Sequence, residues 1–358
     1  MARVKLEDVC ERGSSNLKQS DVVDKDGDYP IYGASGYIGN VDFYHQEQPY
    51  VAVVKDGAGI GRTTLHPAKS SVIGTMQYLL PKGNVLPEYL CYVVKYMHLE
   101  KYFTGATIPH IYFKDYKNEE FNLDSLDRQK EIVSTLNKIE KVIESRTKEL
   151  ELLDELIRAR FVEMFGNPDV NEKNWNVYKM EQLCEVGSSK RIYQNDQSLT
   201  GIPFLRISDL VNRMDTGSKD CDLFIPEELF EKFKKQGLVP ARGDILLTAR
   251  GTLGRCYIIQ DDDEFYFQDG MITWLSKFDE KITPLYISYL FEMPEFRKQI
   301  DSLQAGSTVA YLSISMTKEL NVMVPPLELQ NQFAAFVAQT DKSKFDIHKF
   351  LYCTSNNT

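Results

Sequence analysis

The segment LNKIEKVIESRTKELELLDELIRARFVEMFGNP, residues 136–168, predicts one long helix with a continuous apolar seam. From Ile132 onward, apolar side chains recur at alternating steps of four and three residues, which is the heptad spacing of a coiled coil. A helix of about 40 residues spans on the order of 60 Å, so it needs a partner helix to cover the seam. Arg146 and Arg160 interrupt the seam, which otherwise consists of Ile132, Leu136, Ile139, Ile143, Leu150, Leu153, Ile157 and Met164.

The segments before and after this helix repeat each other. KLEDVCERGSS (5–15) and KMEQLCEVGSS (179–189) are identical at seven of eleven positions. Further matches follow in the same order: GIGRTT with TLGRCY, PEYLCYVV with PLYISYLF, GATIPHIYFKDY with GSTVAYLSISMT, and LDSLDRQ with VPPLELQ. We interpret the chain as a tandem duplication of a unit of roughly 165 residues.

Each copy begins with short β-type runs separated by Gly, Pro and Asp and ends in a helix, which predicts an α+β fold. The second helix starts at Leu327, and Phe333 and Val337 match Ile132 and Leu136. Its seam then weakens, because Lys344 stands where Ile143 stood. We expect β-rich domains at 1–125 and 167–326, a long helix at 126–166, a shorter helix at 327–351 and a disordered tail at 352–358.

The composition is that of a globular protein, with 42% apolar and 26% charged residues. The net charge is −10, so any contact with nucleic acid has to use local basic clusters. The six cysteines are scattered, and the sequence contains neither a membrane-length apolar run nor a signal-peptide core. We therefore expect a cytoplasmic location.

The sequence contains no complete catalytic motif among those considered below. VAVVKDGAGIGRTT (51–64) has Asp56 and Arg62 where a nucleotide-binding loop requires Gly and Lys. The histidines lack the spacing of a zinc site. No nucleophile elbow of the Gly-x-Ser-x-Gly type occurs.

Taken together, the repeated starts, the GATIPHI and GSTVAYL loops and the LDSLDRQKEI and VPPLELQNQF segments resemble the specificity subunit of type I restriction–modification systems. Residues 136–168 are similar to the central conserved spacer of that family. The resemblance implies that each β-rich region is a target recognition domain that reads one half of a split DNA sequence. It also implies that the two long helices pack as an antiparallel coiled coil and fix the distance between the domains.

The same resemblance implies a non-catalytic role within a larger complex. Two modification subunits, which carry S-adenosylmethionine, would dock on the helices and domains, and restriction subunits using ATP and Mg would be able to join. We expect double-stranded DNA as a partner, no membrane partner, and no cofactor or metal bound by this chain itself.

Residues for DNA contact are sought on the loops that match between the copies, because base reading needs polar and basic side chains on loops. For each of them the alternative is a surface hydrogen bond or a turn requirement. The first copy offers Lys55, Arg62, Thr63, Thr64, Thr107, His110, Tyr112 and Lys114, and the second offers Arg206, Ser208, Arg250, Thr252, Arg255, Ser307, Thr308 and Tyr311.

Three alternatives stay open. The weak second helix raises the possibility of an orphan or truncated specificity protein that does not assemble productively. The chain would otherwise be the DNA-recognition module of a fused restriction–methylation enzyme, or a coiled-coil adaptor with no role on DNA.

Overall fold

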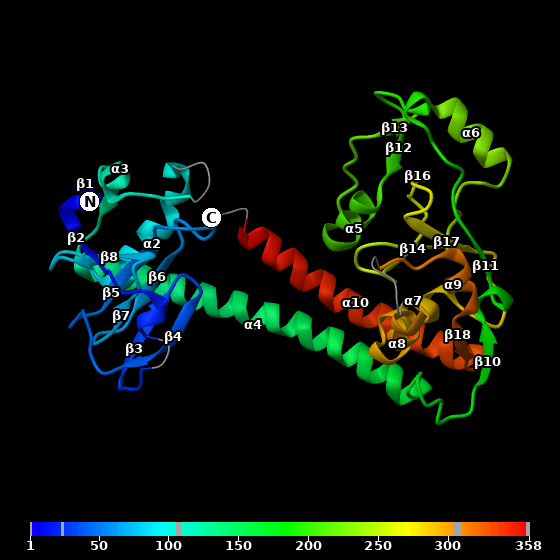
Figure 1. Cartoon of the computed structure of the whole chain (residues 1–358), viewed down its shortest axis with the longest axis horizontal. Helices are drawn as coiled ribbons and strands as arrows, with labels where there is room; N and C mark the ends of the chain where they lie inside the picture. The colour runs from blue at the N-terminus through cyan, green and yellow to red at the C-terminus, as the bar shows by residue number, and fades with distance from the viewer. Residues whose placement is uncertain (1, 23–24, 105–108, 304–309, 356–358) are drawn as a thin grey trace. The chain divides into compact units, whose positions relative to one another are not determined.

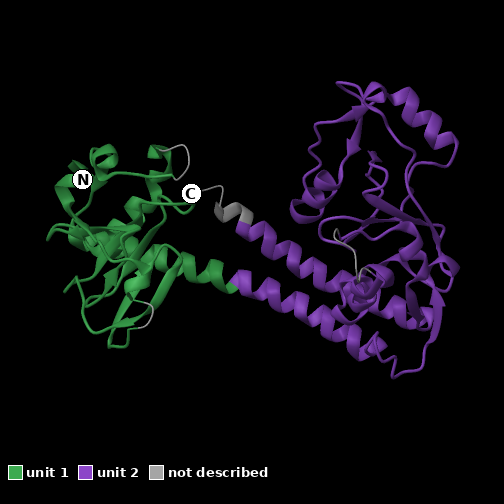
Figure 2. Cartoon of the chain, in the orientation of Figure 1, with its two compact units in different colours: residues 1–145 green, residues 146–358 purple. Residues whose placement is uncertain are grey.

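The computed structural model describes residues 2–22, 25–104, 109–303 and 310–355, with side chains as far as Leu351. The chain forms two compact units, residues 1–145 and 146–358 (Figure 2). Both units combine helices with small sheets, so the predicted α+β class is confirmed (Figure 1). Within the described ranges, no helix is both long enough and apolar enough to cross a membrane.

Unit 1 contains a strand pair, a four-stranded sheet and a three-stranded sheet. The pair is β1 (Ala2–Lys5) with β9 (Glu120–Leu123). The four-stranded sheet has the order β2 (Cys10–Ser14), β8 (Met76–Pro81), β5 (Tyr50–Val54), β6 (Thr63–His66). The three-stranded sheet has the order β4 (Gly36–Val41), β3 (Tyr29–Gly33), β7 (Ser71–Val72). The helices are α1 (Leu6–Val9), α2 (Pro87–Tyr96), α3 (Phe113–Tyr116) and the first half of α4 (Leu126–Phe165), with 3-10 turns η1 (Gln19–Asp21) and η2 (Leu99–Tyr102).

Unit 2 repeats this plan. The pair is β10 (Asn176–Lys179) with β18 (Asn321–Val324). The larger sheet has the order β11 (Glu185–Gly187), β17 (Ile272–Ser276), β14 (Ile245–Thr248), β15 (Cys256–Ile258), and the smaller the order β13 (Phe224–Ile225), β12 (Ile202–Leu205), β16 (Tyr266–Phe267). The helices are the second half of α4, α5 (Ile207–Thr216), α6 (Glu227–Lys235), α7 (Pro284–Glu292), α8 (Pro294–Leu303), α9 (Ile314–Glu319) and α10 (Leu327–Ser355), with 3-10 turns η3 (Met180–Gln182) and η4 (Gln194–Asp196).

The correspondence holds strand for strand. In each unit, the middle strand of the smaller sheet pairs antiparallel with one neighbour and parallel with the other. This shared topology confirms the tandem duplication. Helices α5 and α6 have no counterpart among the described residues of unit 1, and they account for part of the greater length of the second copy.

One inner strand of each larger sheet, β5 in unit 1 and β14 in unit 2, is buried on both faces. In β5, Val51 and Val53 join one hydrophobic cluster with helix α2, while Tyr50, Ala52 and Val54 join another on the opposite face. Successive side chains of a strand point to opposite faces, so burial on both sides requires an unbroken apolar run. The run YVAVV meets this requirement, and the loop after β5 therefore starts from a buried strand.

The repeated sequence starts form a short helical turn followed by the first strand of the larger sheet. Cys10 and Cys184 are buried, and their thiols donate to the carbonyls of Leu6 and Met180 at 3.3 and 3.7 Å. Burial raises the pKa of both thiols to about 12. The cysteines therefore act as packing residues.

Helix α4 has 40 residues, of which 126–145 belong to unit 1 and 146–165 to unit 2. Within unit 2, it packs antiparallel against α10, because Phe161 contacts Phe333 while Asp154 pairs with Lys344 at 2.6 Å. Helix α10 runs to Ser355, four residues beyond the predicted end at 351, and residues 356–358 lie outside the described part of the chain. Lys344 continues this helix and forms an ion pair instead of ending the packing.

The predicted seam residues divide into three groups. Ile157, Met164, Phe333 and Val337 meet in the core of unit 2, and Ile132 packs against the core of unit 1. Leu136, Leu150 and Leu153 are half-buried, whereas Ile139 and Ile143 are 37% and 36% exposed.

The prediction missed Phe161 and Phe165, which are fully buried beside Phe333. They lie one residue off the strict heptad stepping, because the end of α4 packs on a globular domain and follows the 3.6-residue period of a straight helix.

Candidate nucleic-acid interface

In unit 1, the loop between β5 and β6 packs against the segment that starts at Pro109. The amide of Gly57 donates to the carbonyl of Pro109 at 3.0 Å, and the amide of Ile111 donates to the carbonyl of Lys55 at 2.9 Å. A β-bridge joins Asp56 to His110. Two loops that are about 50 residues apart in the sequence thus form one surface.

Unit 2 forms the same junction between the β14–β15 loop and the segment before α9. The amide of Leu312 donates to the carbonyl of Ala249 at 3.0 Å, and a β-bridge joins Arg250 to Tyr311. This register aligns Asp56 with Arg250 and His110 with Tyr311. The sequence comparison had correctly paired these loops.

In unit 1, four of the predicted residues lie together on this surface. His110 Nδ1 lies 2.7 Å from Asp56 Oδ1, and Lys55 Nζ lies 3.4 Å from Asp56 Oδ2. The Tyr112 ring stacks with His110, and Lys114 Nζ lies 5.3 Å above the Tyr112 ring. An aromatic ring that is 49% exposed, with a lysine above it, suits contact with a sugar or a phosphate.

The other predicted residues of unit 1 lie along the β5–β6 hairpin. Arg62 is exposed, and its Nη1 donates to the carbonyl of Ala34 at 3.0 Å. Thr63 is buried and donates to the carbonyl of Gly61, whereas the Thr64 hydroxyl lies 2.7 Å from His66 Nε2. The two threonines therefore make intramolecular hydrogen bonds, and Arg62 alone extends to the surface.

In unit 2, Arg250 is exposed and its guanidinium lies 5.1 Å from the centre of the Tyr311 ring. Two glycines in the left-handed region, Gly251 and Gly254, shape the turn after it. Thr252 is exposed, and its carbonyl accepts a hydrogen bond of 2.5 Å from the Thr248 hydroxyl, which holds the turn closed.

The two remaining predicted arginines of unit 2 are neutralised by carboxylates. Arg255 pairs with Asp215 of α5 at 2.6 Å, and the hydrogen bond from Arg255 holds the pKa of Asp215 below its ordinary value. Arg206 donates hydrogen bonds from Nε and Nη2 to the two carboxylate oxygens of Asp209, at 3.0 and 3.1 Å. The Ser208 hydroxyl also donates to Asp209 at 3.4 Å, so these side chains start helix α5.

The three remaining predicted DNA-contacting residues, Thr107, Ser307 and Thr308, lie outside the described residues. Sequence reasoning missed the acids that decide which cations are available, namely Asp56, Asp209 and Asp215. The spacing of Arg206 and Asp209 at i and i+3 could have indicated the first helical turn. Asp215 gave no such signal, because it lies 40 residues from Arg255.

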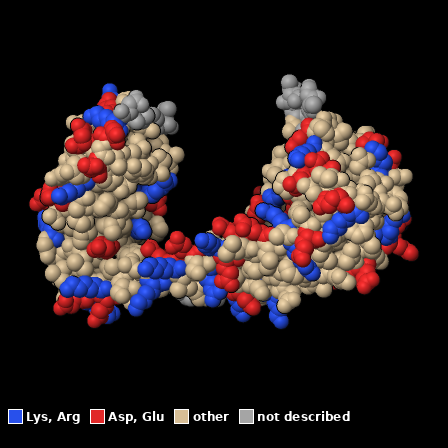
Figure 3. Space-filling view, turned by 90° about the horizontal axis from the view of Figure 1, so that it is seen from below, with Lys and Arg blue, Asp and Glu red and all other residues tan. Residues whose placement is uncertain are grey.

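The surface charge is mixed. Lys and Arg are interspersed with Asp and Glu on the face shown in Figure 3, without a broad basic patch. No group of His, Cys, Asp and Glu in the described ranges is arranged to hold a metal ion.

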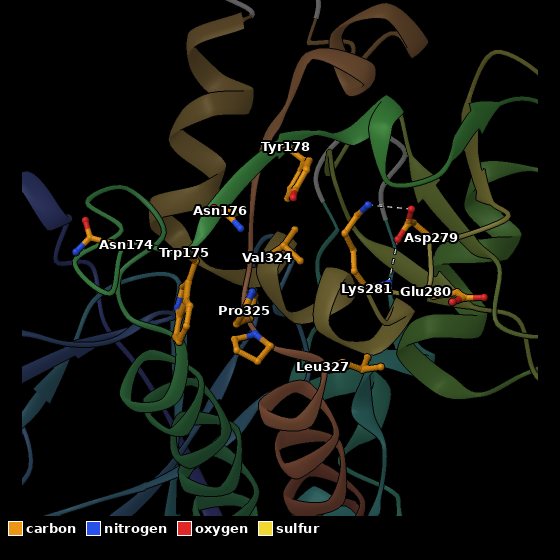
Figure 4. Close-up of a pocket in the computed structure, with 11 residues that line it drawn as sticks. Asn174, Trp175, Asn176, Tyr178, Asp279, Glu280, Lys281, Val324, Pro325 and Leu327 are labelled. Atoms are coloured by element: carbon orange, nitrogen blue, oxygen red, sulfur yellow. Dashed lines mark hydrogen bonds and ion pairs between the residues drawn. The ribbon is translucent and has the colours of Figure 1, made fainter.

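A hollow of about 640 Å³ lies at the base of α10 in unit 2, where Tyr178, Lys281 and Asp279 line it (Figure 4). Lys281 pairs there with Asp279 at 2.9 Å and lies 5.0 Å from the centre of the Tyr178 ring. Within this hollow, the charge of Lys281 is therefore neutralised by Asp279.

Comparison with known proteins gives one consistent answer. Residues 1–155 and 172–352 match the family described as type I restriction modification DNA specificity domain. A putative type I restriction enzyme specificity subunit of Haemophilus influenzae is 26% identical over 87% of this chain and 80% of its own length. The type I restriction enzyme MjaVIII specificity subunit of Methanocaldococcus jannaschii is 24% identical over 81% of this chain and 72% of its own length.

Two solved structures share the fold. The S subunit of a type I restriction–modification system from M. genitalium aligns with a TM-score of 0.59 at 16% identity and covers 99% of this chain and 92% of its own. A chain from a structure of type I restriction–modification complex assembly and conformational transition aligns with a TM-score of 0.52 at 13% identity, covering 98% of this chain and 95% of its own.

Proposed function

Because the chain belongs to the type I restriction–modification DNA specificity family, we propose that each of its two units reads one half of a bipartite DNA site. The chain is the DNA-recognition subunit of such a system, binds DNA and assembles with other subunits. In our proposal it is itself non-catalytic and acts in the cytoplasm.

The observation that supports two reading heads is the repeated junction of hairpin and loop, with Asp56–His110 in one unit and Arg250–Tyr311 in the other. The same backbone carries different side chains at equivalent positions. Such a scaffold provides two domains of the same fold with different base specificities, as a split DNA site requires.

We assign the helices two roles. Helices α4 and α10 set the distance between the half-sites and bind two modification subunits that carry S-adenosylmethionine. Restriction subunits that use ATP and Mg would join this core. The chain itself would bind neither a cofactor nor a metal.

Co-expression with the modification subunit, followed by mapping of methylated adenines, tests the proposal. We expect one motif made of two short blocks at a fixed gap, and a complex of two modification subunits with one specificity subunit by light scattering. A short continuous motif would contradict the two-reader scheme.

The same preparation separates the alternatives. An orphan or truncated specificity protein would fail to form the complex, although the Lys344–Asp154 ion pair shows that α10 continues through the position that raised this doubt. A module of a fused restriction–methylation enzyme would cleave or methylate DNA without added subunits. A coiled-coil adaptor would show no salt-dependent retention of duplex DNA.

A further inference from the structure

We infer that Arg62 in unit 1 and Arg250 in unit 2 each recognise a guanine in their half-site, whereas Arg255 is a positioning residue that does not contact a base. This inference rests on the proposed function and adds the base class that each hairpin reads. It follows from three observations on equivalent positions of the duplicated hairpin.

The first observation is the register of the two hairpins. The amide of Val54 donates to the carbonyl of Arg62 at 2.9 Å, and the amide of Thr248 donates to the carbonyl of Arg255 at 3.0 Å. Arg62 therefore corresponds to Arg255, on the arm that leads into the edge strand. Arg250 corresponds to Asp56, on the arm that follows the inner strand, β14 or β5.

The second observation concerns charge. Arg255 is held by Asp215, which belongs to helix α5, and the described part of unit 1 has no counterpart of this helix. Among the described residues, Arg62 and Arg250 form no ion pair, and their side chains contact the Ala34 carbonyl and the Tyr311 ring instead. Each hairpin thus has one guanidinium without a carboxylate partner. In unit 1 this guanidinium lies on the arm before the edge strand, and in unit 2 it lies on the arm after the inner strand.

The third observation concerns orientation. Arg62 is aligned by the Ala34 carbonyl, and Gly59 leaves room for it, since a Cβ there would lie 3.2 Å from Arg62 Nη2. Arg250 is aligned by the Tyr311 ring. Both partners, a carbonyl and an aromatic ring, are uncharged. They orient the planar guanidinium and leave several of its five N–H donors available.

A guanidinium fork held in this way matches guanine, whose O6 and N7 accept two parallel hydrogen bonds in the major groove. In unit 1, the position equivalent to Arg250 is occupied by Asp56. Asp56 cannot bind these guanine atoms, because a carboxylate only accepts hydrogen bonds. Since the two arginines occupy opposite arms of the hairpin, the guanines lie at different steps of the two half-sites.

The test uses the full-length chain in complex with its modification subunit and selects binding sequences from a randomised duplex library. Variants Arg62→Lys, Arg250→Lys and Arg255→Lys keep the charge but lose the bidentate fork. We expect the first two to lower guanine preference roughly tenfold to hundredfold at a single position, each in a different half-site. Arg255→Lys should leave every base preference unchanged.

Gly59→Ala provides a second route, because the added Cβ would lie 3.2 Å from Arg62 Nη2 and would shift the guanidinium slightly without removing it. It should reduce the same guanine preference by less than Arg62→Lys does, with thermal unfolding showing that the variant is folded. The inference is overturned if the lysine variants leave all preferences intact, if they weaken all sequences uniformly, or if Arg255→Lys also relaxes a base. Failure of the proposed function looks different, because the unaltered complex would then select no two-block sequence.

Discussion

Gln129 and Gln330 make the same three hydrogen bonds in the two copies of the fold. Gln129 Oε1 accepts from the amide of Leu86 at 2.8 Å, and its Nε2 donates to the carbonyls of Asn84 and Asp124. Gln330 repeats this pattern with the amide of Thr283 and the carbonyls of Lys281 and Pro325. Each side chain connects the start of a long helix to the loop before α2 or α7 and to the residue after the last strand, β9 or β18.

The first prediction concerns these glutamines, which are at most 1% exposed. Gln129→Leu or Gln330→Leu leaves buried backbone groups without partners, at about 1–3 kcal/mol for each such group. We expect each variant to lower the free energy of unfolding of its own unit. Both tryptophans, Trp175 and Trp274, lie in unit 2, so their fluorescence during urea unfolding reports on Gln330→Leu.

Circular dichroism and amide exchange report on Gln129→Leu. The exposed Gln332 is the matched control, and Gln332→Leu should change the free energy of unfolding by less than about 0.5 kcal/mol. An equal loss in the control would contradict the assignment.

The second prediction concerns the contact between α4 and α10. Phe161→Ala should destabilise unit 2 by about 3–5 kcal/mol, because the ring is fully buried against Phe333 and Phe165. Urea unfolding followed by tryptophan fluorescence measures the loss. Val162→Ala, at a neighbouring side chain that is 41% exposed, is the control and should cost far less.

A double-mutant cycle with Phe333→Ala should then show that the two losses are not additive, since the two rings contact each other. Simple additivity would mean that the rings do not share one packing site.

The third prediction concerns acid sensitivity of unit 1. Burial lowers the pKa of His66 from 6.5 to about 4, and the ring lies against Tyr50 and Tyr32. Between these pKa values the unfolded state binds more protons than the folded state, so stability falls as the pH drops from about 6.5 to about 4. His66→Gln should remove this part of the acid dependence, as measured by urea unfolding at pH 7 and pH 5.

His98 is exposed and has a positive φ, which Asn tolerates, so His98→Asn is the control. It should keep the acid dependence of the unaltered protein. The same acid slope in His66→Gln would exclude His66 as its source.

The fourth prediction concerns Lys114, which lies above the exposed Tyr112 ring. If it contacts phosphate, Lys114→Ala weakens binding of all DNA sequences alike and reduces the slope of log affinity against log salt by about one. Filter binding between 50 and 200 mM salt measures both effects. Lys148→Ala removes the same charge from helix α4 instead of a loop and should leave the slope unchanged.

Much of the fold could be read from local sequence. The repeated starts, the apolar run YVAVV and the heptad spacing of α4 predicted the duplicated α+β units and the long helix. These features succeed because strand and helix periods are local properties. The end of α4 was less well predicted, since Phe161 and Phe165 are buried by a domain that comes later in the chain.

The sequence by itself determined the duplicated scaffold and which loops of the two copies correspond. It also supplied the set of polar and basic residues from which the readers are built. Only the tertiary structure decided which of those residues are available. Arg62 and Arg255 occupy equivalent positions, yet Asp215, from an inserted helix, neutralises Arg255 alone. Ion pairing depends on distance through space, which spacing along the chain does not fix.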